Sequence, residues 1–306
     1  MRRNYYVPYD ERNQDYANSG NANLGRFRLG DYAVLPDGRK YRFALNGATV
    51  QIAGRLNQSV ARVDEHENVA ADVARAIDAV IISATLGAIL AGIDIYAEGV
   101  VHVNDAVGEG YTYRIRRANT AGAAHAAVAA SGVLTANLDA GEMVQVALTT
   151  SSEVSFTRNR FHQTIITATP PTAQLAGVSP GVAAAARFYW SQVEGYAAVL
   201  VDGTLLAGLP VQASITAAGA VENVKRRVRT GGTVTVASPT VGVGQLTDQD
   251  GAVVSGMLSD ISTSVATTVD ISGGIAVNAP MVGMCVKANA DSASEHALID
   301  LQYLGS

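Results

Sequence analysis

Apolar positions along the chain alternate with polar ones in short runs, and Gly, Asn or Asp-Gly separates one run from the next. The stretch Gly177–Ser214 shows this pattern most densely. Within it, Asp202-Gly203 lies between the apolar runs AAVLV and TLLAG. An Asp-Gly pair in this setting favours a tight β-hairpin, because Gly tolerates the positive φ that such turns need. We therefore predict a hairpin that turns at Asp202-Gly203.

A second turn signal occurs near the start of the chain, where AVL and KYRFAL flank Pro36-Asp37-Gly38. Pro and Gly both preset turn geometry. In KYRFAL, Tyr41 and Phe43 alternate with Arg42, as in a half-exposed strand. The pattern predicts a hairpin here as well.

From Ala79 onward the pattern predicts strand after strand. The segments that alternate or are rich in β-branched residues are AVIISATLG, DIYAEGVVHVND, EGYTYRIRRAN, MVQVALTT, EVSFTRN, HQTIITAT, VQASITAAGAVENV, TVTVAS, VGVGQLT, AVVSGMLSD and PMVGMCVKANADSASEHALIDL. Short strands at close spacing predict a sandwich or a barrel. The fold class is therefore predicted to be all-β, with two β-sandwich or barrel-like domains and an extended N-terminal arm.

Two stretches depart from this pattern. In Ser59–Ala79, Val69, Val73 and Ile77 recur at four-residue spacing, which favours a helix. The Ala-rich insert Thr120–Ser131 fits either a short helix or a surface loop.

The pair Pro170-Pro171 interrupts any strand ladder and marks a boundary, which we place near Gln174. The predicted organisation is an arm with the first hairpin in residues 1–62, a β-rich domain in 63–174 and a second β-rich domain in 175–306.

The charge distribution predicts an interaction arm. Only 16% of the residues are charged, below the roughly 25% usual for soluble domains, which suggests that much surface is covered by neighbours. Residues 1–62 hold ten Lys/Arg and five Asp/Glu, a balance of +5, whereas the rest of the chain holds twelve and twenty-two, a balance of −10. Such asymmetry is typical of an arm that binds a partner.

The arm carries Tyr and Arg, which are enriched at protein interfaces. The predicted interface residues are Arg2, Arg3, Tyr5, Tyr6, Tyr9, Arg12, Tyr16, Arg26 and Arg28. We expect them to contact an acidic protein surface, such as a neighbouring copy, although an ordinary solvated segment fits the same residues. No nucleic-acid partner is expected, because the basic residues are spaced singly and the rest of the chain is acidic.

The sequence predicts a soluble protein without a membrane partner. Its first residues contain no apolar signal region, and the longest nearly apolar run, Ala79–Ile93, is shorter than the 18 or so residues that span a bilayer. The single cysteine, Cys285 in MVGMCVKA, cannot form an internal disulfide, and its apolar setting predicts a buried, inert thiol.

We predict neither catalytic residues nor a metal or other cofactor. Gly177–Gly181 matches the G-x-S-x-G nucleophile elbow, but Pro180 lacks the N–H that the oxyanion hole requires. We interpret these residues as a turn between domains that follows a linker.

The histidines and the lone tryptophan also favour structural roles. The five histidines are scattered, and the charged run Asp64–Glu67 is predicted to be a solvated loop. Trp190 is expected to be a core anchor, with a sugar-stacking platform as the alternative.

Several stretches together resemble the virion proteins that tailed bacteriophages encode near their capsid genes. The resemblance covers most of residues 30–224, and it is carried by GDYAVLPDGRKYRFALNGATVQIAGRLNQS, YAEGVVHVNDAVGEGYTYRIRRAN, ALTTSSEVSFTRNRF and ITATPPTAQLAGVSPGVAAAARFYWSQVEGYAAVLVDGTLLAGLPV. The closing PMVGMCVKANADSASEHALIDLQYL looks like the last hairpin of capsid decoration proteins.

The resemblance implies a cement or decoration protein on the outer face of an icosahedral head, partnered by the major capsid protein and by itself, as a homotrimer. No catalytic or cofactor residue is carried over. The alternatives are a main shell component, a head or tail fibre that binds host glycans, and a polysaccharide-cleaving enzyme.

Overall fold

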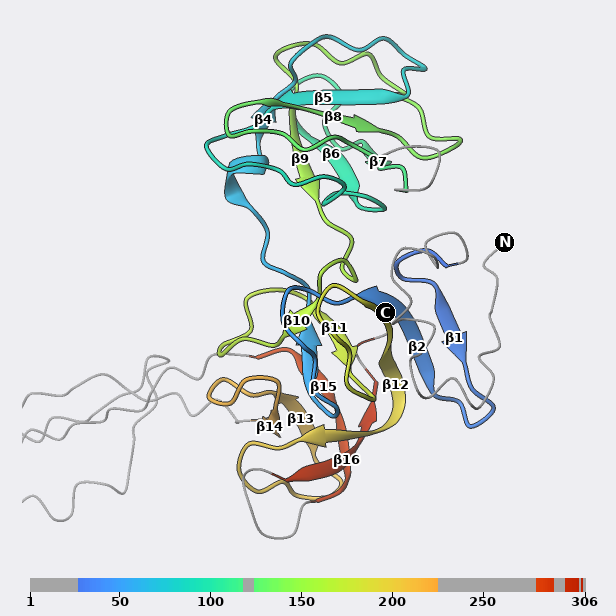
Figure 1. Cartoon of the computed structure of the whole chain (residues 1–306), viewed down its shortest axis with the longest axis vertical. Coiled ribbons are helices and arrows are strands. Elements are labelled where there is room, and N and C mark those ends of the chain that lie inside the picture. Colours follow the sequence, from blue (N-terminus) through green and yellow to red (C-terminus); the bar gives the residue numbers. More distant parts are fainter. Residues whose placement is uncertain (1–26, 118–123, 225–278, 289–294, 303, 305–306) are drawn as a thin grey trace, which may run out of the picture. The chain divides into compact units, whose positions relative to one another are not determined.

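A computed structural model describes residues 27–117, 124–224, 279–288, 295–302 and 304. These residues form strands, turns and a single 3-10 turn at Asp64–His66, with no α-helix among them. The largest sheet curls like half of a barrel (Figure 1). The predicted all-β fold class is confirmed.

The curled sheet has ten strands, eight of them in the order β10-β3-β11-β12-β16-β15-β13-β14, and β2 joins β12 to β1. The strands are β1 (Tyr32–Val34), β2 (Lys40–Leu45), β3 (Leu56–Gln58), β10 (Ile165–Ile166), β11 (Leu175–Val178), β12 (Phe188–Leu200), β13 (Pro210–Ala213), β14 (Val221–Asn223), β15 (Met281–Lys287) and β16 (His296–Leu301). The 13-residue β12 organises this sheet, because its first half pairs with β2 and its second half pairs with β16.

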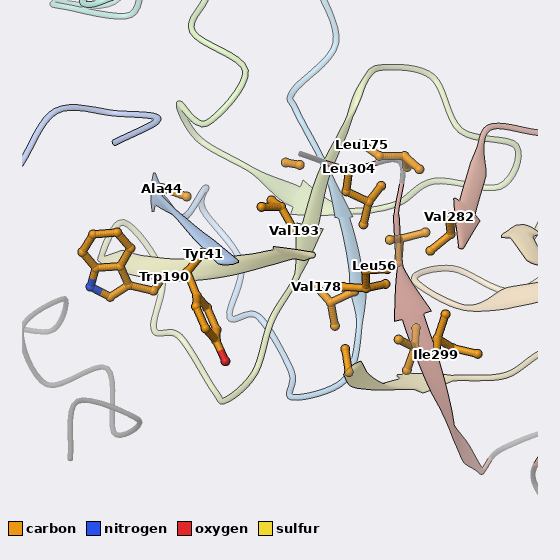
Figure 2. Packing of buried hydrophobic residues seen from close by; sticks show 14 of the residues in the cluster. Tyr41, Ala44, Leu56, Leu175, Val178, Trp190, Val193, Val282, Ile299 and Leu304 are labelled. Carbon is orange, nitrogen blue, oxygen red and sulfur yellow. The ribbon is translucent and has the colours of Figure 1, made fainter. Parts of the chain in front are cut away.

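Side chains from this sheet form the first core, a cluster of buried residues that runs from Phe27 to Leu304. Figure 2 shows Leu56 beside Val178, its partner across the β3–β11 ladder, and Ile299 on β16. The first core combines residues from before residue 62 with Phe161 and with residues after 174.

The remaining strands form two smaller sheets. One has the order β4-β9-β6-β7 and the other pairs β5 with β8. Their bounds are β4 (Val69–Ala70), β5 (Ile81–Thr85), β6 (Val100–Asp105), β7 (Thr112–Arg114), β8 (Val133–Asn137) and β9 (Glu153–Thr157). Their buried side chains form the second core, which runs from Ile82 to Phe156.

The hairpin predicted at Pro36-Asp37-Gly38 is confirmed. β1 and β2 pair there as an antiparallel ladder, and Gly38 has a φ of +85°. Tyr41 and Phe43 are buried while Arg42 is partly exposed, because alternate residues of a strand point to opposite faces.

The hairpin predicted at Asp202-Gly203 is wrong. Gly203 does have a positive φ of 79°, but β12 pairs with β16 rather than with the residues that follow this turn. The Asp202 carboxylate instead accepts hydrogen bonds from the hydroxyls of Ser214 and Thr216. The sequence indicated the turn correctly, but it did not indicate that the strand before the turn, β12, pairs with the distant β16.

Two further predictions are corrected. The stretch Ser59–Ala79 is not helical: it contains the 3-10 turn and then β4, whose Val69 pairs with Val154 of β9. The linker predicted before Gly181 is also wrong, because this stretch includes β11, whose four residues are all buried. The strands predicted between residues 225 and 278 lie outside the described residues.

Candidate binding surfaces

Of the predicted interface residues, only Arg28 lies within the described part of the chain. The others, Arg2, Arg3, Tyr5, Tyr6, Tyr9, Arg12, Tyr16 and Arg26, lie outside it. Arg28 Nη1 donates to Asp139 Oδ2 at 2.6 Å, and this bond raises the pKa of the guanidinium. Its backbone N–H donates to Asp31 Oδ2 at 2.8 Å. Arg28 thus makes an internal ion pair.

Neighbouring bonds hold the same segment in place. Glu98 is buried, and its Oε2 accepts the backbone N–H of Leu29 at 2.7 Å. Burial raises the pKa of the Glu98 carboxyl, against the opposing effects of that N–H and of Arg117. Arg117 Nη2 donates to the Phe27 carbonyl at 2.6 Å. Residues 27–29, which belong to the predicted arm segment 1–62, are therefore tied to the loops around β6 and β7.

Large apolar side chains are exposed most densely in one stretch, Val73–Ile93, which we call the apolar segment. Its exposed members are Val73, Ile77, Val80, Ile89, Leu90 and Ile93. Leu90 and Ile93 are 65% and 63% exposed, while Ala91 between them is fully buried and bridges to Val128. The backbone here is fixed by the second core, and it presents apolar side chains to solvent.

A groove on the curled sheet surrounds Tyr196, and we call it the Tyr196 groove. Tyr196 lies on β12 and is 57% exposed. Two adjoining hollows, of about 300 and 460 Å³, share Tyr196 and Arg39. The other lining residues that bear on its chemistry are Asp37, Gln192, Gly195, His296 and Asp300.

Sequence reasoning missed Tyr196. The alternation of the strand could have indicated it. Residues 196–199 of β12 are alternately exposed and buried, and Tyr196 occupies one of the outward-facing positions. The sequence could not show that Asp300 faces it from β16, since that pairing joins strands about a hundred residues apart.

A third hollow, of about 340 Å³, is lined by Arg42, Arg158, Arg160 and Glu98, among others. Arg160 is held by the carbonyls of Leu175 and Leu304, through Nε at 2.5 Å and Nη2 at 2.9 Å. Burial, and next the charge of Arg42, lower the pKa of Arg160.

The core role predicted for Trp190 is confirmed. Trp190 is 3% exposed and packs edge-on against Phe27 and Phe43 at centroid distances of 5.1 and 5.2 Å. The alternative of a sugar-stacking platform at this residue is wrong, because its ring faces do not reach solvent.

The prediction of a solvated loop at Asp64–Glu67 is wrong for His66, which is fully buried. His66 Nε2 lies 2.8 Å from the Ile89 carbonyl, and its Nδ1 lies 2.5 Å from the Tyr96 hydroxyl. A carbonyl can only accept, so Nε2 carries the proton and Tyr96 donates to Nδ1. Within the described ranges, no three His, Cys, Asp or Glu side chains cluster in a way that could hold a metal ion.

Ser179 of the elbow-like motif is buried, and its Oγ accepts from Asn57 Nδ2 at 3.2 Å. Gly177 has a φ of +116°, and a side chain there would meet Ser191. These residues form a strand and its end, rather than the predicted interdomain turn. Cys285 is buried as predicted, and burial raises the pKa of its thiol.

No described stretch forms a helix long and apolar enough to cross a membrane. No protein-family model, curated protein or solved structure matches this chain.

Proposed function

We propose that the chain is a structural protein of a tailed-bacteriophage particle, which decorates and stabilises the outer face of the icosahedral head. The observation that carries the proposal is the apolar segment, where six large apolar side chains are exposed within residues 73–93. Scattered exposed apolar residues are ordinary, but burial against a partner would account for this density of exposed apolar side chains in one short segment.

The resemblance in turns and strands supports the class of partner. In this proposal the apolar segment contacts the major capsid protein or a neighbouring copy in a homotrimer, and the basic residues before Phe27 contact an acidic surface. Many weak contacts on one particle would add up through their high effective concentration. No catalytic step or cofactor is part of the proposal.

The direct test is quantitative mass spectrometry of the virions produced by the genome that encodes the chain. A copy number comparable with that of the main shell protein, on particles that keep a separate shell protein, supports decoration. A few copies per particle would instead indicate a fibre. If the chain forms the shell itself or is absent from virions, the proposal is wrong.

A second test addresses the apolar segment. Leu90→Ser combined with Ile93→Ser should weaken binding to heads stripped of the protein by about tenfold or more, because each truncation removes apolar area from an interface. Val182→Ser is the matched control, since Val182 is also 63% exposed but lies outside the segment. Equal binding of the double variant and the control would remove the apolar segment from the interface.

A further inference from the structure

The Tyr196 groove is lined by a partly exposed aromatic residue, since Tyr196 is 57% exposed. The preceding residue, Gly195, has no side chain and has a φ of +82°. A Cβ placed on Gly195 would lie 3.0 Å from Cγ of Arg39, so Arg39 packs closely over this glycine. This close approach brings the aliphatic part of Arg39 beside the strand position from which Tyr196 projects.

Polar groups of both kinds surround the ring. Asp300 is the cross-strand partner of Tyr196, and one of its oxygens, Oδ2, accepts from Gln302 Nε2 at 2.9 Å. Arg39 Nε donates to Asp37 Oδ2 at 2.7 Å. Among the described residues, the Arg39 Nη groups and Asp300 Oδ1 make no hydrogen bond. Arg39 can therefore donate further hydrogen bonds through its Nη groups, and Asp300 can accept further hydrogen bonds through Oδ1.

We propose that the Tyr196 groove binds a neutral carbohydrate, with the Tyr196 ring against the apolar C–H face of a sugar and with Asp300 and Arg39 bonded to its hydroxyls. The hollows of about 300 and 460 Å³ fall in the size range of small-molecule sites. The charges of Asp37, Asp300 and Arg39 sum to −1 when both carboxyls are ionised, which disfavours an anionic ligand. This inference does not depend on the proposed place in a virion.

Neighbouring residues support a fixed groove. Gln192 Nε2 donates to the Tyr196 carbonyl at 2.9 Å, which secures the strand beneath the ring. The residue after Tyr196, Ala197, is buried in the first core. The ring is therefore presented by rigid strands rather than by a loop, and a ligand would not have to order it.

The test is to screen the full chain on an array of neutral oligosaccharides and to measure the affinity of positive sugars by saturation-transfer NMR and calorimetry. Tyr196→Ala should weaken binding by about tenfold, the scale of one aromatic contact. Tyr196→Phe should keep most of the affinity, because the ring face remains. Asp300→Asn should also weaken binding, because it replaces an ionised acceptor.

Tyr111→Ala is the matched control, since Tyr111 is an exposed tyrosine that follows β6 near the second core. Far-UV circular dichroism checks that each variant is folded. The proposal is wrong if no neutral sugar binds the wild-type chain at millimolar concentration, or if Tyr196→Ala and Tyr111→Ala bind sugar equally well. If sugar does not bind but Tyr196→Ala abolishes self-association in sedimentation, the groove is a contact between copies instead.

Discussion

The first core and the second core are filled by different kinds of side chain. In the first core, Phe43 stacks on Phe188 at 5.1 Å, and Phe27 and Trp190 pack around Phe43. The contacts of these rings with one another depend on volume and shape.

The centre of the second core is a polar network around Tyr96. The Tyr96 hydroxyl donates to His66, and its backbone N–H donates to His125 Nε2 at 3.0 Å. His125 Nδ1 in turn lies 2.8 Å from the Ala126 carbonyl and so carries the proton. This arrangement requires a neutral His125, because a protonated Nε2 could not accept the Tyr96 N–H.

The two regions also differ at their surfaces. Of the nineteen exposed large apolar side chains among the described residues, ten lie between Val73 and Met143, around the smaller second core. The first core also contains buried hydrogen bonds, because the Tyr189 hydroxyl bonds to Asn57 and Thr164. The two regions therefore differ most clearly in the number of large apolar side chains that they expose.

The largest effect is expected from Phe43→Ala. Removing a buried ring that three aromatic neighbours contact should lower the free energy of unfolding by about 3–5 kcal/mol. Urea denaturation followed by Trp190 fluorescence measures this, because the only tryptophan lies in the first core. Ile52→Ala, at a 49% exposed position, is the control. A loss below about 1 kcal/mol would contradict the proposed packing.

Leu134→Ala tests whether the cores unfold separately. Leu134 on β8 is fully buried in the second core, and its truncation should cost about 3 kcal/mol. Because the two cores share no residue, amide exchange in β5 and β8 should accelerate while the Trp190 fluorescence midpoint stays in place. An equal shift of that midpoint would show that the two cores form one cooperative unit.

Acid should destabilise the protein through two buried histidines. Burial lowers the pKa of His125, and burial, followed by the charge of Arg158, lowers the pKa of His162 to about 4. In the unfolded chain both would titrate near 6.5. The histidine contribution to stability is thus complete above pH 6.5 and is lost as the pH falls from 6.5 toward 4, by on the order of 2 kcal/mol for His162.

His162→Leu separates this effect from the titration of carboxyl groups. No hydrogen bond of the His162 side chain is seen among the described residues, so leucine removes the titrating group without removing a bond. Urea midpoints measured from pH 7.5 to pH 4 should fall less steeply for this variant than for the wild type. His296→Gln, at an exposed site, is the control. Identical slopes for wild type and His162→Leu would rule out His162 as the acid-sensitive group.

Features with a local cause were predictable from the sequence. The Pro36-Asp37-Gly38 turn and the alternation in β2 followed from residues within a few positions of each other, as did β5, β6 and β9. β15 and β16 were also predicted as a strand pair, and the structure confirms their antiparallel register.

Features that depend on distant partners were not predictable. β12 looked like half of a hairpin with the residues after Gly203, but its partners are β2 and β11, before it, and β16, about a hundred residues after it. His66 looked solvated because its neighbours are charged, whereas its environment is set by Tyr96 thirty residues away. The Tyr196 groove was missed for the same reason, since Arg39 joins it from the turn between β1 and β2, and Asp300 joins it from β16.

The smallest effect expected here concerns the hydroxyl of Tyr96. Tyr96→Phe keeps the ring, which packs against Phe156 at 5.5 Å, but leaves the buried Nδ1 of His66 without its donor. The loss should be about 1–2 kcal/mol in the free energy of unfolding. Tyr111→Phe, at an exposed ring, should change stability by less than about 0.5 kcal/mol.

A double-mutant cycle assigns this loss to one bond. In a His66→Leu background the acceptor is absent, so adding Tyr96→Phe should cost much less than it does in the wild type. If the cost of Tyr96→Phe is the same in both backgrounds, the hydroxyl acts through something other than His66. The second core would then resemble the first, with its aromatic ring held by packing rather than by a directional bond.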